Sequence, residues 1–170
     1  MKTQFLSTFA SLAILFSASL SSAQTAVPQN NQEKKMPIQK TYDFLKATQH
    51  YFLATVDGDR PRVRPFGTIH IFEGKLYIQT GRSKNVAKQL LANGKAEICA
   101  FNGKEWIRVS GILVEDPRRE AKASMLKEYE SLRKIGYSED DPNTMVLYFQ
   151  PGSVTSTISS FTAPPVKMKF

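Results

Sequence analysis

The sequence predicts a mainly β protein, a small closed or nearly closed antiparallel barrel with a few helices. Three observations carry this prediction. Short runs rich in aromatic and β-branched residues follow one another after residue 50. Turn signals separate these runs, and Asn102-Gly103 is the strongest hairpin signal among them. Apolar residues at helical spacing are confined to three short segments.

The first 23 residues have the layout of a secretory signal peptide. Lys2 gives a positive start, Phe5 to Leu20 is apolar or small apart from Ser and Thr, and residues 21–23 (Ser-Ser-Ala) suit a signal peptidase. The apolar run is too short to span a bilayer, which argues against a retained anchor helix. We therefore expect an exported chain, periplasmic or secreted, that begins at Gln24 and has no stable membrane insertion.

Residues 24–170 fit a single domain with short flanking segments. Cleavage of the signal removes one lysine and no acid, so the net charge of +8 becomes +7. Such a basic surface favours nucleic acid, anionic lipid or a phosphorylated small molecule, and export makes nucleic acid the least suitable partner. Cys99 is the only cysteine, so an apolar core rather than a disulfide must hold the fold together.

The elements expected after the signal are one linker, one domain at 37–151 and a tail at 152–170. The linker, 24–36, is rich in Gln, Asn, Lys and Glu and has little to bury. Helices are expected to begin at Pro37, Ser83 and Pro117, with Gly94 as the C-cap of the second. Strands are expected at 51–56, about 62–72, 75–80, 96–101, 105–115 and 145–150, with tight turns at 57–59, 73–74 and 102–103.

The strand expected at about 62–72 alternates between two kinds of side chain, and alternate residues share a face. We expect the apolar face to join the core; it carries Val63, Pro65, Gly67, Ile69 and Ile71. The other face suits an anion attached to a flat ring; it carries Arg62, Arg64, Phe66, Thr68 and His70. The alternative is a solvated outer face whose charges serve solubility.

The segment 80–85, Thr-Gly-Arg-Ser-Lys-Asn, places cations at the start of the second helix. Ser83 occupies the expected N-cap position, and the positive end of the helix dipole disfavours Arg82 and Lys84 beside it. A bound phosphate would resolve this conflict because it accepts the free amides and neutralises both cations. The alternative is that both side chains point into water, at a cost of roughly a few tenths of a kcal/mol.

The strand at 105–115 also alternates, with Ile107 and Val109 on one face and Trp106 and Arg108 on the other. Trp106 is either a ring that stacks on a ligand or a plain barrel residue, and a buried Arg108 would need an anionic partner. Cys99 lies in an apolar strand and is expected to be a small core residue. Two histidines and one cysteine give no metal cluster of usable spacing. No catalytic residue is predicted.

Four motifs, in this order, resemble the pyridoxamine 5′-phosphate oxidase-like split-barrel flavoproteins. They are Tyr-Phe-Leu-Ala-Thr-Val with Asp-Gly-Asp-Arg-Pro-Arg-Val-Arg-Pro-Phe-Gly (51–67), Lys-Leu-Tyr-Ile-Gln-Thr (75–80), Ser-Lys-Asn (83–85) and Trp-Ile-Arg-Val-Ser-Gly (106–111). The resemblance covers about residues 38–151. It implies a six-stranded antiparallel split β-barrel of the FMN-binding type that forms a homodimer, with FMN at the interface between subunits.

The resemblance also implies which residues bind the cofactor. Arg64 matches the arginine that contacts the phosphate-bearing chain of the flavin, and Gln79 and Thr80 match the strand end beside the ring. The phosphate-binding Ser-Lys pair corresponds to Ser83 and Lys84. Three further positions complete the set: Asn85, where some relatives have a basic residue, and Trp106 and Arg108, on a strand that often touches the cofactor.

This chain departs from the pyridoxamine phosphate oxidases at its C-terminal end. Those enzymes hold their substrate with a longer segment that contains Arg and His, whereas here no Arg follows Arg133 and no His follows His70. Some relatives bind haem or a deazaflavin instead of FMN.

Two functional classes therefore follow from the sequence. The first is an exported FMN-dependent oxidoreductase that acts on an unknown small molecule. The alternative is a non-catalytic binding protein for haem, flavin or another anionic ligand on the same barrel. A single-strand nucleic-acid barrel fits the charge but not the export signal.

Overall fold

The structure, a computed structural model, describes residues 30–170, with side chains from residue 37 onward. The predicted signal peptide, 1–23, and linker residues 24–29 lie outside the described residues. The described chain has nine strands: β1 (Tyr51–Asp57), β2 (Arg60–Phe66), β3 (His70–Phe72), β4 (Lys75–Gly81), β5 (Lys95–Phe101), β6 (Glu105–Asp116), β7 (Thr144–Phe149), β8 (Thr155–Ser160) and β9 (Val166–Lys169). Its helices are α1 (Asn30–Thr48), α2 (Asn85–Ala92), α3 (Arg119–Glu128) and α4 (Ser131–Lys134).

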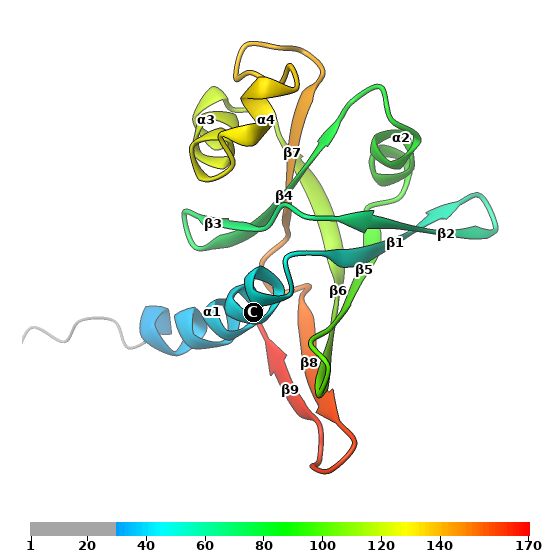
Figure 1. Ribbon diagram of the computed structural model, residues 1–170, viewed down its shortest axis with the longest axis vertical. Coiled ribbons are helices and arrows are strands. Elements are labelled where there is room, and N and C mark those ends of the chain that lie inside the picture. The colour runs from blue at the N-terminus through cyan, green and yellow to red at the C-terminus, as the bar shows by residue number, and fades with distance from the viewer. Residues whose placement is uncertain (1–29) are drawn as a thin grey trace, which may run out of the picture.

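The strands form one antiparallel sheet in the order β2-β1-β5-β6-β7-β4-β3, and β8 and β9 extend it beside β6 (Figure 1). The long strand β6 joins the two parts of this sheet. Its first half pairs with β5 and β8, and its last four residues pair with β7. Because β2 and β3 end the order without pairing with each other, the barrel is split. The predicted fold class, a mainly β antiparallel split barrel, is confirmed.

The number of strands differs from the six that the resemblance implies, for two reasons. The single strand expected at about 62–72 is divided into β2 and β3 by Gly67, Thr68 and Ile69, which lie outside both ladders. The segment 152–170, for which no structure was predicted, supplies β8 and β9. The tail is thus part of the sheet, where alternate Ser and Thr side chains occupy a half-buried strand.

Two helix predictions also differ from the structure. The first helix begins at Asn30 instead of Pro37, so residues 30–36 of the expected linker are helical. Gly94 is not a left-handed C-cap: α2 ends at Asn93 in an extended conformation. Gly94 is required for a close approach, because a Cβ there would lie 2.7 Å from the carbonyl oxygen of Leu113. The Leu113 amide donates a 2.7 Å hydrogen bond to the Gly94 carbonyl.

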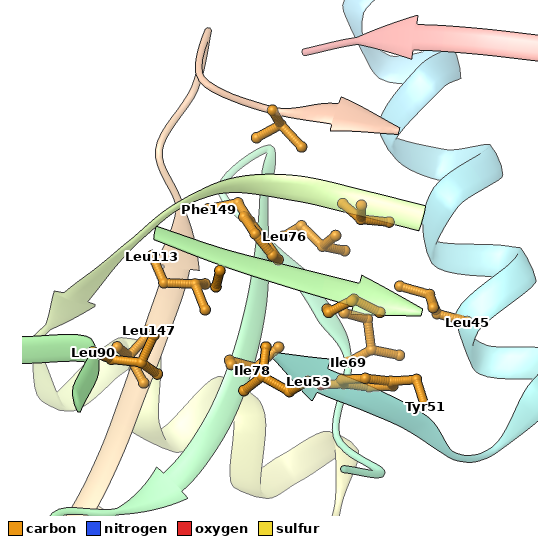
Figure 2. Close-up of a cluster of buried hydrophobic side chains, with 14 of the residues drawn as sticks. Leu45, Tyr51, Leu53, Ile69, Leu76, Ile78, Leu90, Leu113, Leu147 and Phe149 are labelled. Carbon is orange, nitrogen blue, oxygen red and sulfur yellow. The ribbon is translucent and has the colours of Figure 1, made fainter. Parts of the chain in front are cut away.

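The core lies between the inner face of the sheet and helices α1 and α2 (Figure 2). Leu45 from α1 and Leu90 from α2 cover aliphatic residues from five strands, including Leu53, Leu76, Ile78, Ile98, Ile107, Leu113 and Leu147. Ile107 and Val109 are fully buried, as their alternation predicts. The prediction that Cys99 is a core residue is wrong, because its side chain is exposed.

The predicted orientation of the β2 region is wrong in its first half. Val63 is 63% exposed, and Pro65 and Gly67 are also exposed, whereas Arg64 is half-buried. The register with β1 explains this, because directly paired residues point to the same side of a sheet. Arg64 pairs with Leu53, which is fully buried, so Arg64 must point inward and Val63 outward. Ile69 is buried as predicted. It lies in the break between β2 and β3, where the inward and outward alternation of β2 no longer applies.

A buried carboxylate at the end of β6 joins the second part of the sheet to α3. Asp116 accepts hydrogen bonds from Tyr77 Oη at 2.8 Å and from the backbone amide and guanidinium of Arg118. Arg118 also pairs with Glu73 at the β3–β4 turn. Burial raises the pKa of Asp116, but the hydrogen bonds from Arg118 and Tyr77 outweigh burial and hold that pKa at about 2.

Asp116→Asn should therefore remove part of the acid sensitivity of the fold. A carboxyl whose pKa is lowered on folding stabilises the protein above its unfolded pKa of about 4, and this stabilisation is lost as the pH falls towards 2. The difference in unfolding free energy between wild type and variant should shrink by roughly 2 kcal/mol between pH 5 and pH 2. Urea unfolding across that range measures this. Asp59→Asn is the control, because Asp59 is exposed in a turn and forms no ion pair in the described residues. A wild-type-to-variant difference independent of pH would contradict the assignment.

Candidate functional site

A cleft of about 270 Å³ opens where β2, β4, the start of α2 and the segment after α3 meet. Its lining contains two cations and no acidic residue. The lining residues are Arg64, Pro65, Phe66, Gly67, Thr68, Gln79, Thr80, Lys84, Val86, Leu132, Ile135 and Tyr137. Four of the eight residues predicted to bind a cofactor are therefore brought together: Arg64, Gln79, Thr80 and Lys84.

Gln79 and Thr80 line this cleft, and each has a buried polar atom without a hydrogen-bond partner in the described residues. Both residues are almost fully buried, at 5% and 3% exposure, because the strand β4 is covered on both faces. Gln79 Oε1 and Thr80 Oγ1 are buried without a hydrogen-bond partner in the described residues. Such a group typically costs about 1–3 kcal/mol when it stays unpaired. A ligand that offers hydrogen-bond donors at this position would remove the cost.

Arg64 is a half-buried cation with neutral partners only. Its guanidinium donates to Thr55 Oγ1 at 2.6 Å, to Gln89 Oε1 at 2.7 Å, and to the backbone carbonyls of Leu53 and Arg62. Burial, followed by the neighbouring charge of Arg62, lowers the pKa of Arg64, yet a guanidinium stays protonated in proteins. Among residues 37–170 no carboxylate forms an ion pair with Arg64. Its position therefore favours an anionic ligand.

The segment before α2 is arranged differently from the prediction. Lys84, not Ser83, is the N-cap residue, and no side chain caps the helix. The Ser83 amide donates to Asn143 Oδ1 at 2.9 Å. Arg82 pairs with Glu115, so the expectation that one phosphate neutralises both Arg82 and Lys84 is wrong for Arg82. The first amides of α2 have no intrahelical acceptor, and Lys84 lies beside them in the cleft.

The other predicted residues lie outside this cleft. Ser83 is exposed on the same loop, and Asn85 lines a neighbouring hollow with Lys88. Trp106 and Arg108 point to the outer face of the sheet, opposite the buried Ile107 and Val109. There the ring of Trp106 packs against the ring of Phe161, with 5.1 Å between the ring centroids. The side chain of Arg108 is 61% exposed and pairs with Glu97, so the idea of a buried arginine is wrong.

The floor of the cleft is held by two tyrosines whose role the sequence did not indicate. Tyr51 donates to the Thr68 carbonyl at 2.6 Å, and Thr68 Oγ1 accepts from the Gln79 amide at 3.0 Å. Tyr129 Oη bridges the amide and the carbonyl of Ile69, both at 2.9 Å. Residues 67–69 are thereby fixed although no strand contains them.

Charged side chains from two helices support Tyr129. Lys46 donates to Tyr129 Oη at 3.1 Å and to Glu128 at 2.5 Å. The Lys46 hydrogen bond lowers the pKa of Glu128. His70 hydrogen-bonds Ser124 behind the cleft, and burial lowers the pKa of His70, with Glu128 opposing this effect. These contacts attach α1 and α3 to the floor of the cleft.

Across residues 30–170, no three His, Cys, Asp or Glu side chains gather closely enough to hold a metal ion. No helix in that range combines the length and apolar character needed to cross a bilayer.

Tyr129→Phe should destabilise the protein, because it leaves the amide and carbonyl of Ile69 without their partner. Each unpaired buried group costs about 1–3 kcal/mol, so a loss of at least about 1 kcal/mol is expected in urea unfolding. Tyr148→Phe is the matched control; its half-buried ring packs on Tyr77, and its hydroxyl bonds no residue in the described chain. Equal losses in the two variants would show that the Tyr129 hydroxyl does not stabilise the floor.

The fold and the cleft together define a split-barrel protein with a cation-lined cleft beside a helix N-terminus. Residues 38–157 match the pyridoxamine 5′-phosphate oxidase family. The crystal structure of a NimC/NimA family protein from Clostridium acetobutylicum is 38% identical, with a TM-score of 0.77 over 84% of this chain and 98% of that one. The chain therefore belongs to the pyridoxamine 5′-phosphate oxidase family, as the sequence predicts.

More distant structures share the fold. A pyridoxamine 5′-phosphate oxidase-related, FMN binding protein from Nostoc punctiforme is 17% identical, with a TM-score of 0.54 over 83% of this chain and 89% of that one. A haem binding protein from Mycobacterium smegmatis is 12% identical, with a TM-score of 0.59 over 84% of this chain and 59% of that one. At this identity the likeness concerns the fold alone. No curated protein matches the chain.

Proposed function

We propose that this protein binds FMN in the cleft and is an FMN-dependent oxidoreductase acting on a small molecule. The observation that carries the proposal is the composition of the lining of one cleft without acidic residues. Gln79 and Thr80 line it and have unpaired buried oxygens, and Arg64 and Lys84 line it and form no ion pair in the described residues. FMN has one N–H donor and several acceptors on its flat ring, and a phosphate dianion at the other end. The N–H suits Gln79 Oε1, the ring acceptors suit the Thr80 hydroxyl, and the phosphate suits the two cations. When bound, FMN supplies hydride or electron transfer, which no side chain here can provide.

The residues of the chain bind and orient this cofactor. Lys84 and the first amides of α2 meet the phosphate, since a helix N-terminus favours an anion and charge-assisted hydrogen bonds are the strong ones. Arg64 adds a second cation from β2. The unpaired oxygens of Gln79 and Thr80 form hydrogen bonds with the flavin ring. Thr68 keeps β4 in place through the Gln79 amide. None of these groups is assigned as a catalytic acid or base.

Lys84→Ala and Arg64→Ala should weaken FMN binding by roughly ten- to a hundredfold, because one charge-assisted contact is worth about 1.5–3 kcal/mol. Riboflavin binding should change much less, since riboflavin lacks the phosphate. Titration of both flavins against the variants measures this, with Lys88→Ala as a control that removes the same charge from the exposed face of α2. Equal losses for FMN and riboflavin would mean that these residues shape the fold and do not contact phosphate.

A homodimer is the assembly that we propose. The cleft of about 270 Å³ is smaller than typical small-molecule sites of about 300–1,000 Å³. The outer sheet face, which comprises Phe52, Val63, Cys99, Phe101 and Arg108, exposes three large apolar side chains that no helix covers in the described chain. A second copy on this face would bury these three apolar side chains. Trp106 and Arg108 of one subunit would then complete the cleft of the other, which would account for their positions on the outer face.

Light scattering on the mature protein should then report twice the chain mass. Phe52→Asp places a charge on the outer sheet face, where it would be costly to bury, and should shift the protein towards monomer. Leu91→Asp, at another exposed apolar position, is the control. A monomeric wild type that still binds FMN would show that the site needs no second copy.

Export is proposed from the N-terminal sequence, which lies outside the described residues. Protein from the native host should begin at or near Gln24 and be recovered from the periplasm or medium. N-terminal sequencing of each fraction measures this. A chain that begins at Met1 in the cytosol would contradict the signal peptide.

A non-catalytic carrier of haem, flavin or another anionic ligand is the second candidate. It is favoured by the lining of the cleft, which contains no histidine, cysteine or carboxylate to transfer a proton near neutral pH. The absorbance spectrum of protein purified from the native host distinguishes flavin from haem. A bound flavin that no nicotinamide reduces would favour the carrier over the oxidoreductase.

A further inference from the structure

We propose that the segment 131–137, which comprises α4 and the turn after it, selects the substrate and takes the flat, uncharged ring of a small molecule. This inference rests on the proposed function, because it concerns the uncharged side of the same cleft. The segment contributes Leu132, Ile135 and Tyr137 to the lining, and none of these residues belongs to the set predicted to bind the cofactor.

The side chains of this segment form an apolar wall. Leu132, Ile135 and Tyr137 face the cleft together with Val86 from α2. Ile135 is 70% exposed, an unusual position for an isoleucine beside a concave site. A planar apolar ring placed against Ile135 would remove this surface from water, which is the dominant favourable contribution in such pockets.

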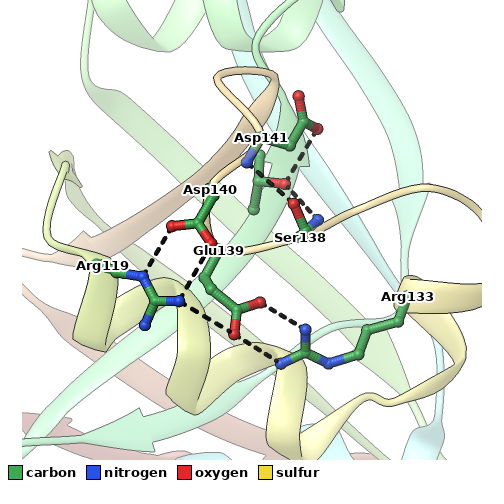
Figure 3. Close-up of polar contacts among 7 residues, drawn as sticks. Arg119, Arg133, Ser138, Glu139, Asp140 and Asp141 are labelled. Atoms are coloured by element: carbon green, nitrogen blue, oxygen red, sulfur yellow. Dashed lines mark hydrogen bonds and ion pairs between the residues drawn. The ribbon is translucent and has the colours of Figure 1, made fainter.

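The wall is braced from its outer side. Arg133 pairs with Glu139 at 2.5 Å, and Arg119 at the start of α3 pairs with Asp140 at 2.8 Å and with Glu139 at 3.8 Å (Figure 3). The Tyr137 amide donates to the Leu132 carbonyl at 3.1 Å, which closes the turn. The charged side chains near this segment are thus held in an external network, whereas the apolar ones line the cleft.

The cleft offers a cationic substrate no side chain to pair with. Among the described residues its ionised side chains are Arg64 and Lys84, which pair with the phosphate when FMN is bound, and no carboxylate lines it. An ammonium group against the apolar wall would therefore lose hydration without a carboxylate to replace it. An anionic substrate would compete with the FMN phosphate for the same two cations. An uncharged ring loses little hydration against Leu132 and Ile135, and the cleft therefore favours it.

The test uses the mature protein loaded with FMN and three probes of matched shape. These are 1-naphthalenemethanol (uncharged), 1-naphthylmethylamine (a cation) and 1-naphthoate (an anion), with affinities measured by calorimetry and by the change in flavin absorbance. The alcohol should bind at least about tenfold more tightly than the amine. Ile135→Ser and Leu132→Ser should each lower the affinity for the alcohol by about tenfold or more, because an apolar pocket that loses methylene groups binds an apolar ring less tightly. The FMN affinity should stay the same.

Leu91→Ser is the matched control, since Leu91 is an exposed apolar residue outside the cleft, and it should not change the affinity for any probe. If both cleft variants keep the wild-type affinity for the alcohol while FMN still binds, the inference is wrong and the proposed function stands. Failure of wild type to bind FMN overturns both. Loss of the dimer in Ile135→Ser, with ring affinity unchanged, would show that a second copy covers this wall and would overturn the inference.

Discussion

The connection between β2 and β3, residues 67–69, is the constraint on which the cleft depends. These residues connect β2 and β3, which lie at opposite ends of the strand order, so they bring the two ends of an open sheet together. No ladder holds them; the hydroxyls of Tyr51 and Tyr129 bind their backbone instead. Arg64 from β2 and Gln79 from β4 line one cleft because the connection at residues 67–69 is fixed.

The distribution of ion pairs gives the cleft its charge. Around it, arginines are neutralised by nearby acids: Arg62 by Asp57, Arg82 by Glu115 and Arg118 by Asp116. Arg64 and Lys84 form no such pair in the described residues. Two cations without an ion pair, Arg64 and Lys84, thus line the same cleft as two residues with unpaired buried oxygens, Gln79 and Thr80. This combination is the structural basis of the proposed ligand site.

The alternation of residues predicted burial correctly on one strand and incorrectly on another. For β6, Ile107 and Val109 are buried as expected, because the strand has neighbours on both sides and a clearly apolar face. For β2, alternation separates two faces but does not say which one points inward. Pairing with β1 decides this, since Arg64 lies opposite the buried Leu53. Four of the residues predicted to bind a cofactor line the cleft, but the sequence did not indicate Thr68 or the segment 131–137.

The sequence by itself determined strands β1 and β4 to β7, the hairpin turns at 73–74 and 102–103, the family, and the cation-bearing segment at 82–85. These features depend on local conformational preference and short spacing. Only the tertiary structure decided that Arg82 is neutralised by Glu115, that Lys84 forms no ion pair within the described part of the chain, and that residues 152–170 complete the sheet. Each of these outcomes depends on a partner distant in the chain. Such partners are selected by the register of a folded sheet, which local periodicity does not encode.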